Sequence, residues 1–182
     1  MIFKSFPEEP NLYVDDIQDM VSKTIERYGM KEWRAGILTN ELHGHLGIYS
    51  IIGVKMGIFA LEKLYAETGD ISIISYAGVK PPISCMNDGL QVSTGATLGH
   101  GLIESKPTDN PRTEAIFRSK EKQLILKINN LTSCMITEEI TEAVNRWGHS
   151  DKYWKYVREL AIQYWYKLDR NNIFEIELSN IK

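Results

Sequence analysis

The sequence predicts an α+β fold in which helices flank a sheet of antiparallel or mixed strands. Apolar residues recur at helical spacing near both ends of the chain, whereas short β-branched or alternating segments gather in the middle and at the end. These segments do not alternate as regularly as a parallel sheet with crossover helices would require. With 182 residues and 43% hydrophobic residues, the chain can bury a core as one domain.

Two helices are predicted in the first part of the chain. The Asp15-Asp16 pair can cap the first, whose apolar and small residues follow at steps of three and four until Gly29 ends it. Residues 30–46 show no clear period, so we expect them to be irregular. A second helix is expected at residues 48–68, because a glycine follows this apolar stretch.

Small residues recur along one face of the second predicted helix, at Gly53, Gly57 and Ala60. A face without large side chains lets another backbone approach closely. We expect it to pack against a strand of the sheet or against the matching helix of a second subunit.

Four strands and two further helices are predicted in the rest of the chain. β-branched or alternating residues place the strands at 71–77, 114–118, 123–128 and 173–178. The middle two form a hairpin around a charged turn. Apolar stripes within residues 140–147 and 157–165 predict the helices. We expect residues 1–131 to form a core and residues 132–182 to pack on it, in the same domain or as a small cap.

The composition excludes several classes of partner. A net charge of −3 and a pI near 5.8 leave no basic surface for nucleic acid. The longest apolar stretch, residues 48–61, is interrupted by polar and glycine residues and is too short to span a membrane. The N-terminal residues do not resemble a signal peptide, so we expect a cytoplasmic protein.

The most informative segment is residues 41–48, Glu-Leu-His-Gly-His-Leu-Gly-Ile, which holds two of the four histidines. His43 and His45 stand two positions apart, and in a strand or turn such side chains project to the same side. The pair could therefore hold one metal ion or one anionic substrate. Alternatively, both histidines only form hydrogen bonds at the start of the following helix.

A second polar segment, residues 85–101, contains a thiol, a carboxylate, a third histidine and four glycines. If Cys85 opens a short helix, Asp88 shares its face, and the helix dipole favours a thiolate that binds metal or acts as a nucleophile. Asp88 could instead be a cap or turn residue. The two histidines and Cys85 would supply two nitrogens and one sulfur, a set that suits a transition metal ion.

The glycine-rich end of this segment, residues 94–101, offers backbone N–H groups that could surround an anion. It is not a Walker loop, because His100 stands where the second glycine should be and no Lys-Ser/Thr pair follows. It does not complete a dinucleotide-binding fingerprint either.

Taken together, the two segments resemble the FmdE family, which is named after one of the subunits of formylmethanofuran dehydrogenase. Residues 43–46, His-Gly-His-Leu, match the start of a His-Gly-His-x-Cys-Pro-Gly motif. Residues 85–101 are similar to the family pattern Cys-x-x-Asp-Gly-Ile-Gln-x-x-Thr-Gly-Cys-Thr-x-Gly-Lys-Gly. The resemblance covers roughly residues 15–130. It implies an α+β core, commonly dimeric, with a bound transition metal, often zinc, near the histidines and the cysteine.

The chain departs from the family pattern at three positions. Gly47 and Ala96 replace cysteines, and His100 replaces a lysine. Thiol-pair redox chemistry is therefore excluded by residue count. The C-terminal four-cysteine zinc finger of some relatives is also missing, since no cysteine follows Cys134.

Our first hypothesis is an FmdE-like, homodimeric metal-binding domain without the zinc finger, related to one-carbon or molybdenum/tungsten enzyme metabolism. His43, His45 and Cys85 are the expected ligands, and zinc is the expected ion.

Four further residues are expected to line the pocket. Asp88 and His100 are candidate catalytic proton carriers, while Gln91 and Thr94 are candidate contacts to a small-molecule ligand. In the second hypothesis these residues serve a metal-dependent enzyme that acts on a small carbonyl compound. The third hypothesis is a degenerate, non-catalytic ligand-binding or protein-interaction module.

Overall fold

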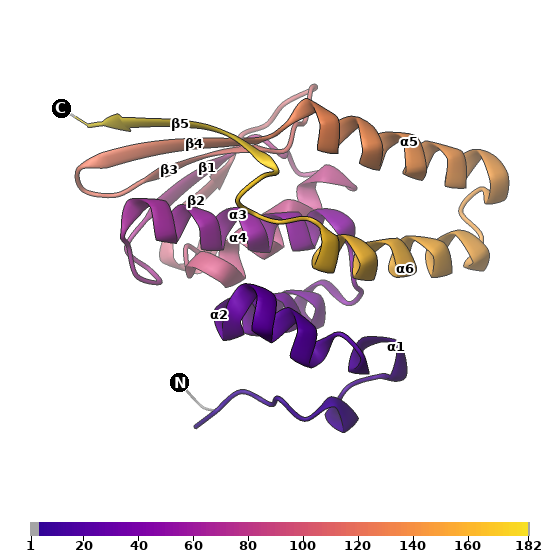
Figure 1. The fold of residues 1–182 in the computed structure, drawn as a ribbon. Coiled ribbons are helices and arrows are strands. Elements are labelled where there is room, and N and C mark those ends of the chain that lie inside the picture. The colour runs from indigo at the N-terminus through magenta and orange to yellow at the C-terminus, as the bar shows by residue number, and fades with distance from the viewer. Residues whose placement is uncertain (1–3, 182) are drawn as a thin grey trace.

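One mixed sheet and a set of helices packed mainly against one of its faces make up the computed structural model, which describes residues 4–181 (Figure 1). The strands are β1 (Ser72–Ser75), β2 (Ile103–Ser105), β3 (Glu114–Arg118), β4 (Lys122–Ile128) and β5 (Phe174–Asn180). Their order is β2-β1-β3-β4-β5, and the β1/β2 pair is parallel while the other pairs are antiparallel. This confirms the predicted α+β fold.

The helices lie below the sheet and beyond one of its ends (Figure 1). They are α1 (Asp15–Gln18), α2 (Val21–His43), α3 (Ile48–Leu64), α4 (Met86–Thr94), α5 (Asn130–Trp147) and α6 (Asp151–Lys167). Figure 1 shows α3 and α4 beneath the strands, α2 below them, and α5 and α6 side by side beyond the end of the sheet. The α2-to-α3 junction, which carries both histidines of the first motif, therefore lies close to α4.

Residues 30–46 are mostly helical, so the expectation of irregular structure was wrong. Gly29 has φ of +85° and ψ of 162° and only kinks α2, which continues to His43. The buried face after the kink mixes Glu32, Gly36 and Thr39 with apolar residues, which hides the helical period. The end of α3 was also misplaced, because Tyr65 adopts a left-handed conformation that ends the helix before residue 68.

The small-residue face of α3 packs against α4 of the same chain, and not against a strand or a second subunit as expected. A Cβ on Gly53 would lie 2.1 Å from the Met86 carbonyl oxygen, and one on Gly89 would lie 2.1 Å from the Ser50 carbonyl oxygen. Real Cβ atoms do not approach backbone this closely. The glycines thus bring α4, with its functional side chains, directly against α3.

Gly53→Ala is expected to lower the free energy of unfolding by about 3 kcal/mol, because α4 must move to admit the methyl group. Chemical denaturation would measure the loss. Gly99→Ala is the matched control, since its nearest neighbour would be 3.9 Å away, and it should change stability by less than about 0.5 kcal/mol. Equal stability of the two variants would contradict the tight α3/α4 contact.

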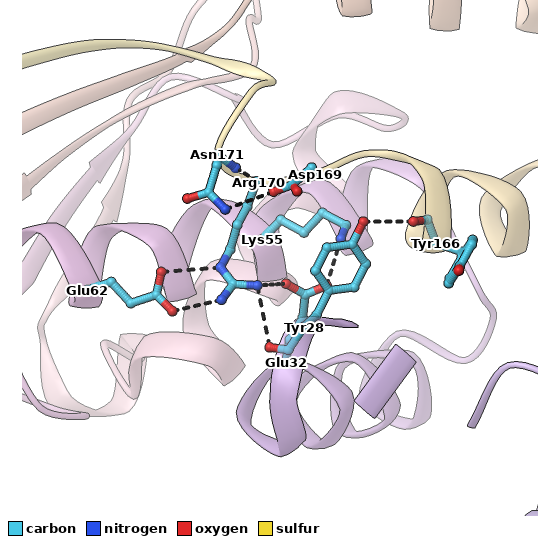
Figure 2. Close-up of polar contacts among 8 residues, drawn as sticks. All are labelled: Tyr28, Glu32, Lys55, Glu62, Tyr166, Asp169, Arg170 and Asn171. Atoms are coloured by element: carbon cyan, nitrogen blue, oxygen red, sulfur yellow. Dashed lines mark hydrogen bonds and ion pairs between the residues drawn. The ribbon is translucent and has the colours of Figure 1, made fainter. Parts of the chain in front are cut away.

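A buried ionic cluster joins α2, α3 and the segment that leads into β5 (Figure 2). Lys55 Nζ donates to Glu32 Oε1 at 2.6 Å, and both side chains are fully buried. Arg170 bridges Glu32, at 2.9 Å, to Glu62, at 2.8 Å. The Lys55 ammonium also lies 3.7 Å from the centre of the Tyr28 ring. This cluster ties the end of the chain to the two central helices.

The C-terminal residues pack closely on the earlier part of the chain. β5 pairs with β4, and Trp165 of α6 stacks on Trp33 with ring centroids 5.1 Å apart. The division into residues 1–131 and 132–182 stays a prediction. A fifth strand, β2, was not anticipated, because its three residues are too few to show a period.

Candidate functional site

The end of α2 brings the two histidines together. His43 is the last residue of the helix, and Gly44, with φ of +79°, donates its N–H to the Asn40 carbonyl and reverses the chain. The imidazole rings of His43 and His45 are then 4.4 Å apart, measured between their centroids. The predicted proximity thus arises from a turn that caps a helix, the second of the two predicted alternatives, and not from a strand.

Asp88 orients the first histidine. Nδ1 of His43 lies 2.6 Å from Asp88 Oδ2 on α4. A carboxylate accepts this hydrogen bond, so Nδ1 carries a proton, and in the neutral form of the ring Nε2 presents a lone pair. That Nε2 atom is buried and has no hydrogen-bond partner among residues 4–181. A buried nitrogen of this kind is suited to a metal ion or to a ligand proton.

Both imidazoles face Gly47, the position at which the family motif has cysteine. A Cβ built on Gly47 would lie 3.5 Å from His45 Nε2 and 3.6 Å from His43 Cδ2, the carbon bonded to Nε2. Nε2 of His45 and the Cδ2 edge of His43 therefore face the backbone of residue 47.

Burial favours the neutral form of His45. Desolvation lowers its pKa, the neighbouring His43 lowers it further, and a hydrogen bond to the His43 backbone acts in the opposite direction. Neutral imidazole is the form that binds metal ions.

Cys85 is the N-cap residue of α4, but its thiol is not activated as predicted. Burial raises the pKa of Cys85, and the charge of Asp88 raises it further, so the thiol keeps its proton at neutral pH. The effect of the helix dipole is therefore outweighed. At neutral pH a bound metal ion would have to displace this proton before the sulfur could coordinate it.

A pocket of about 370 Å³ lies beside His43, at the N-terminal end of α4. Its polar lining residues are His43, Ser84, Cys85, Asn87, Asp88, Gln91 and Ser105. Val79, Pro81, Leu98 and Ile103 supply the apolar part. A volume of this size suits a small organic ligand.

Asn87 builds this pocket, although the sequence did not single it out. Its Oδ1 accepts from Ser75 Oγ at 2.6 Å, and its Nδ2 donates to the Gly78 carbonyl at 2.9 Å. Ser105 donates to the same carbonyl at 2.8 Å. These bonds hold the end of β1 against α4. The sequence could have indicated Asn87, because it lies within the Cys85 motif. No sequence pattern pointed to Ser105.

The predicted site residues do not all meet. His43, Cys85, Asp88 and Gln91 line the pocket beside α4, and His45 contacts His43 from outside it. Within the part of the chain that the structure describes, no three His, Cys, Asp or Glu side chains form a group that could hold a metal ion. The two histidines therefore present a pair of donors, and Cys85 does not complete a three-ligand cluster in this conformation.

Thr94 and His100 lie outside this pocket. The Thr94 hydroxyl is buried, donates to the Leu90 carbonyl at 2.6 Å and accepts from the Ala96 N–H at 3.1 Å. His100 is exposed in the turn after α4, with Nδ1 3.4 Å from the Gly95 carbonyl. Gln91 lines the pocket and accepts from the Leu98 N–H at 3.1 Å. The roles predicted for these three side chains stay predictions.

None of the helices described for residues 4–181 is both long and apolar enough to cross a membrane.

Part of the chain is similar to a protein of Archaeoglobus fulgidus described as a "Probable S-adenosyl-L-methionine-binding protein". The two are 36% identical over 65 residues, which make up 35% of this chain and 18% of that relative. The match spans less than a fifth of the relative's length. The ligand named in the relative's description therefore applies to that protein alone.

A much longer match identifies the family. Residues 42–175 match the family described as "FmdE, Molybdenum formylmethanofuran dehydrogenase operon". The match includes the residues of both motifs that the resemblance quoted. It begins later than the residues 15–130 expected from the resemblance, at residue 42, and extends further, through α5 and α6 to the start of β5. It covers well over half of the chain and confirms the relationship that the two motifs predicted. The chain belongs to the FmdE family.

Proposed function

We propose that this FmdE-family protein binds a transition metal ion, with zinc as the preferred ion, through His43 and His45. The observation that carries the proposal is the buried, unpartnered Nε2 of His43 beside a second imidazole. Leaving a buried polar atom without a partner costs free energy, which a bound ion would recover. Imidazole nitrogen is a common zinc ligand.

Asp88 supports the proposal as an orienting residue. A carboxylate that accepts from the far nitrogen of a ligating histidine fixes the ring and its tautomer, and it makes the ligating nitrogen more basic. The 2.6 Å contact between Asp88 and His43 has this arrangement. In this proposal the main role of Asp88 is therefore to position His43.

Cys85 is the third ligand that we propose. It lines the same pocket as His43. Coordination requires the side chain to turn toward the histidines and to lose its proton, because burial keeps the thiol neutral. Residues 43 and 45 alone would hold the ion weakly, and the thiolate would strengthen the site.

Metal analysis of protein purified without an affinity tag tests the ligands. Wild type, reconstituted with zinc, should hold about one equivalent of the ion. His43→Ala should weaken zinc binding by about 100-fold or more. Loss of a residue that only supports a ligand typically lowers metal affinity by about 10- to 100-fold, and loss of a ligand itself should cost at least as much. Asp88→Asn should weaken zinc binding by about 10-fold. His100→Ala, an exposed histidine outside the pocket, is the matched control and should bind like wild type.

Less than about a tenth of an equivalent of any transition metal in reconstituted wild type would reject the proposal. Substitution with Co²⁺ tests Cys85 separately. A thiolate-to-cobalt charge-transfer band that disappears in Cys85→Ser is expected, and a spectrum without that band would remove Cys85 from the ligand set.

A second candidate function is catalysis on a small carbonyl compound. The pocket of about 370 Å³ favours it, because His43 and Cys85, two of the proposed ligands, line it. A bound zinc ion would supply a Lewis acid and an activated water. Asp88 and Gln91 would contact the substrate from α4. The link to one-carbon or molybdenum/tungsten enzyme metabolism rests on the family description, and the homodimer and cytoplasmic location remain predictions.

A further inference from the structure

β5 forms an open edge of the sheet, although no strand of the sheet is longer. It pairs with β4 on one side only. Figure 1 shows β5, in yellow, running along β4, with α5 and α6 beyond its first residues. Phe174 packs on Phe59 of α3, but every later residue of the strand is exposed. Within residues 4–181, most of this edge is therefore open to solvent.

The hydrogen bonds at the two ends of β5 show which of its backbone groups point away from the sheet. The Ile173 carbonyl accepts from the N–H of Asn129, and the N–H of Ile181 donates to the Glu121 carbonyl. The register between these bonds is unbroken, and hydrogen-bonded residues alternate along an antiparallel pair. The odd-numbered residues of β5 therefore bond to β4. The N–H and C=O groups that point to the open edge belong to the even-numbered residues, Phe174, Ile176, Leu178 and Asn180.

β5 lacks the features that usually prevent an edge strand from pairing with another strand. Such edges are commonly blocked by proline, lysine or a bulge. β5 contains neither proline nor lysine, and its register with β4 shows no bulge. Ile176 and Leu178 lie on the same face as the buried Leu126 and Leu124, yet they are 47% and 53% exposed. Open backbone groups beside exposed apolar side chains are typical of a strand that pairs with a further strand.

The two glutamates of β5 decide how a second copy of the chain could pair with it. Glu175 and Glu177 lie on the opposite face from Ile176 and Leu178, because side chains alternate along a strand. In a symmetric antiparallel pair of identical strands, one residue faces its own copy across the two-fold axis. With Glu177 on the axis, two Glu177 carboxylates would face each other. With Ile176 on the axis, Glu175 would face Glu177 of the second copy, and like charges directly opposite are destabilising.

Placing Leu178 on the axis avoids both conflicts. Glu177 would then face Ser179 of the second copy, whose hydroxyl can donate to the carboxylate. The two Leu178 side chains, now exposed, would be buried against each other. Leu178 also presents its N–H and C=O to the open edge, so it would exchange hydrogen bonds with its own copy. Ile176 would do the same with Asn180 of the second copy.

We propose that two copies of this chain associate through β5, in an antiparallel pair centred on Leu178, so that their sheets join into one continuous sheet. A second copy is the occupant because β5 fits itself in charge, in apolar surface and in hydrogen-bonding groups. The interface gives the predicted homodimer a surface and involves none of the residues of the proposed metal site. A monomeric protein that binds zinc would therefore reject this proposal alone.

Sedimentation velocity over a wide range of protein concentrations tests the association. Wild type should form a species of twice the 20.9 kDa mass of the chain. Leu178→Lys places two ammonium groups across the axis and should weaken association by about 10-fold or more. It should still fold, as thermal melting would show, because the backbone groups of Leu178 do not bond to β4. Leu131→Lys, at an 83% exposed leucine of α5, is the matched control and should associate like wild type.

Disulfide cross-linking tests the register, in a Cys134→Ser background because Cys134 is exposed. Leu178→Cys should form a linked dimer on mild oxidation, since hydrogen-bonded antiparallel partners have Cα atoms about 5.5 Å apart, which suits a disulfide. Ser179→Cys, the exposed neighbouring position, should cross-link much less, because it faces residue 177 of the second copy. Three results would each overturn the proposal: wild type that stays monomeric at all concentrations, association that Leu178→Lys leaves unchanged, or preferential cross-linking of Ser179→Cys.

Discussion

Gly47→Cys is expected to raise the affinity for zinc about 100-fold. Structural zinc sites with four ligands bind with about 10–16 kcal/mol, or roughly 3 kcal/mol per ligand, and each 1.4 kcal/mol is a factor of about ten. A Cβ at residue 47 would lie 3.5 Å from His45 Nε2 and beside the corresponding edge of His43. A thiolate there would complete a three-ligand set without movement of Cys85.

The backbone of residue 47 can accept this change. Its φ of −111° and ψ of 146° are ordinary extended values for any residue. The closest neighbour of the new Cβ is Ser50 Oγ at 3.1 Å, and that side chain, which donates to the Gly47 carbonyl, would have to shift slightly.

Competition titration with a chromophoric chelator would measure the zinc affinity, and Co²⁺ spectra would report the new thiolate bond. Gly47→Ser is the matched control, because it adds a Cβ and a hydroxyl but no thiol, and its zinc affinity should stay near that of wild type. If Gly47→Cys binds no more tightly than Gly47→Ser, the proposal that the two histidine nitrogens converge beside residue 47 is wrong.

Glu32→Leu is expected to reduce the free energy of unfolding by about 3–5 kcal/mol. The substitution leaves the ammonium of Lys55 fully buried beside the Tyr28 ring and without its carboxylate partner. Arg170 would keep its contact to Glu62 but lose the one to Glu32. An unpaired buried charge is much more costly than an apolar group of the same shape.

The double variant Glu32→Leu/Lys55→Met should therefore be more stable than Glu32→Leu alone, since it removes the unpaired buried charge of Lys55. Lys55→Met by itself leaves Glu32 paired with Arg170 and should cost less than Glu32→Leu. Urea denaturation of all four proteins completes the thermodynamic cycle. A double variant that is less stable than Glu32→Leu would show that packing, not the charge of Lys55, governs this cluster.

The same lysine predicts a dependence of stability on pH. Burial lowers the pKa of Lys55 from 10.5 to about 8, although Glu32 acts in the opposite direction. Between these values the unfolded chain binds more protons than the folded one, so the contribution of Lys55 to the free energy of unfolding rises as the pH increases from about 8 to 10.5. Below about pH 8 the contribution of Lys55 to the free energy of unfolding is constant. Lys55→Met should lack this rise.

Much of the site was predictable because it depends on short motifs. His43 and His45 are separated by one glycine, so any local turn keeps their rings close. Cys85 and Asp88 were assigned to one face of a short helix, and both line the same pocket beside α4. The hairpin of β3 and β4 was predicted within one residue, because alternating apolar residues flank a charged turn.

Other features depend on contacts that are remote in the sequence. The pairing of His43 with Asp88 spans 45 residues and requires α4 to dock on the glycines of α3. The helix after Gly29 was missed because its buried face contains Glu32, whose charge is satisfied only by Lys55 and Arg170 from other elements.

By itself, the sequence determined the α+β class, the family and the position of the histidine pair, because periodicity and short motifs act over a few residues. Only the tertiary structure decided what each imidazole faces. Docking of α4 directs His43 Nδ1 to Asp88 and its pocket, while α6 closes a second cavity beside His45. The reason is that burial and hydrogen-bond partners are set by packing between distant segments, which no local pattern contains.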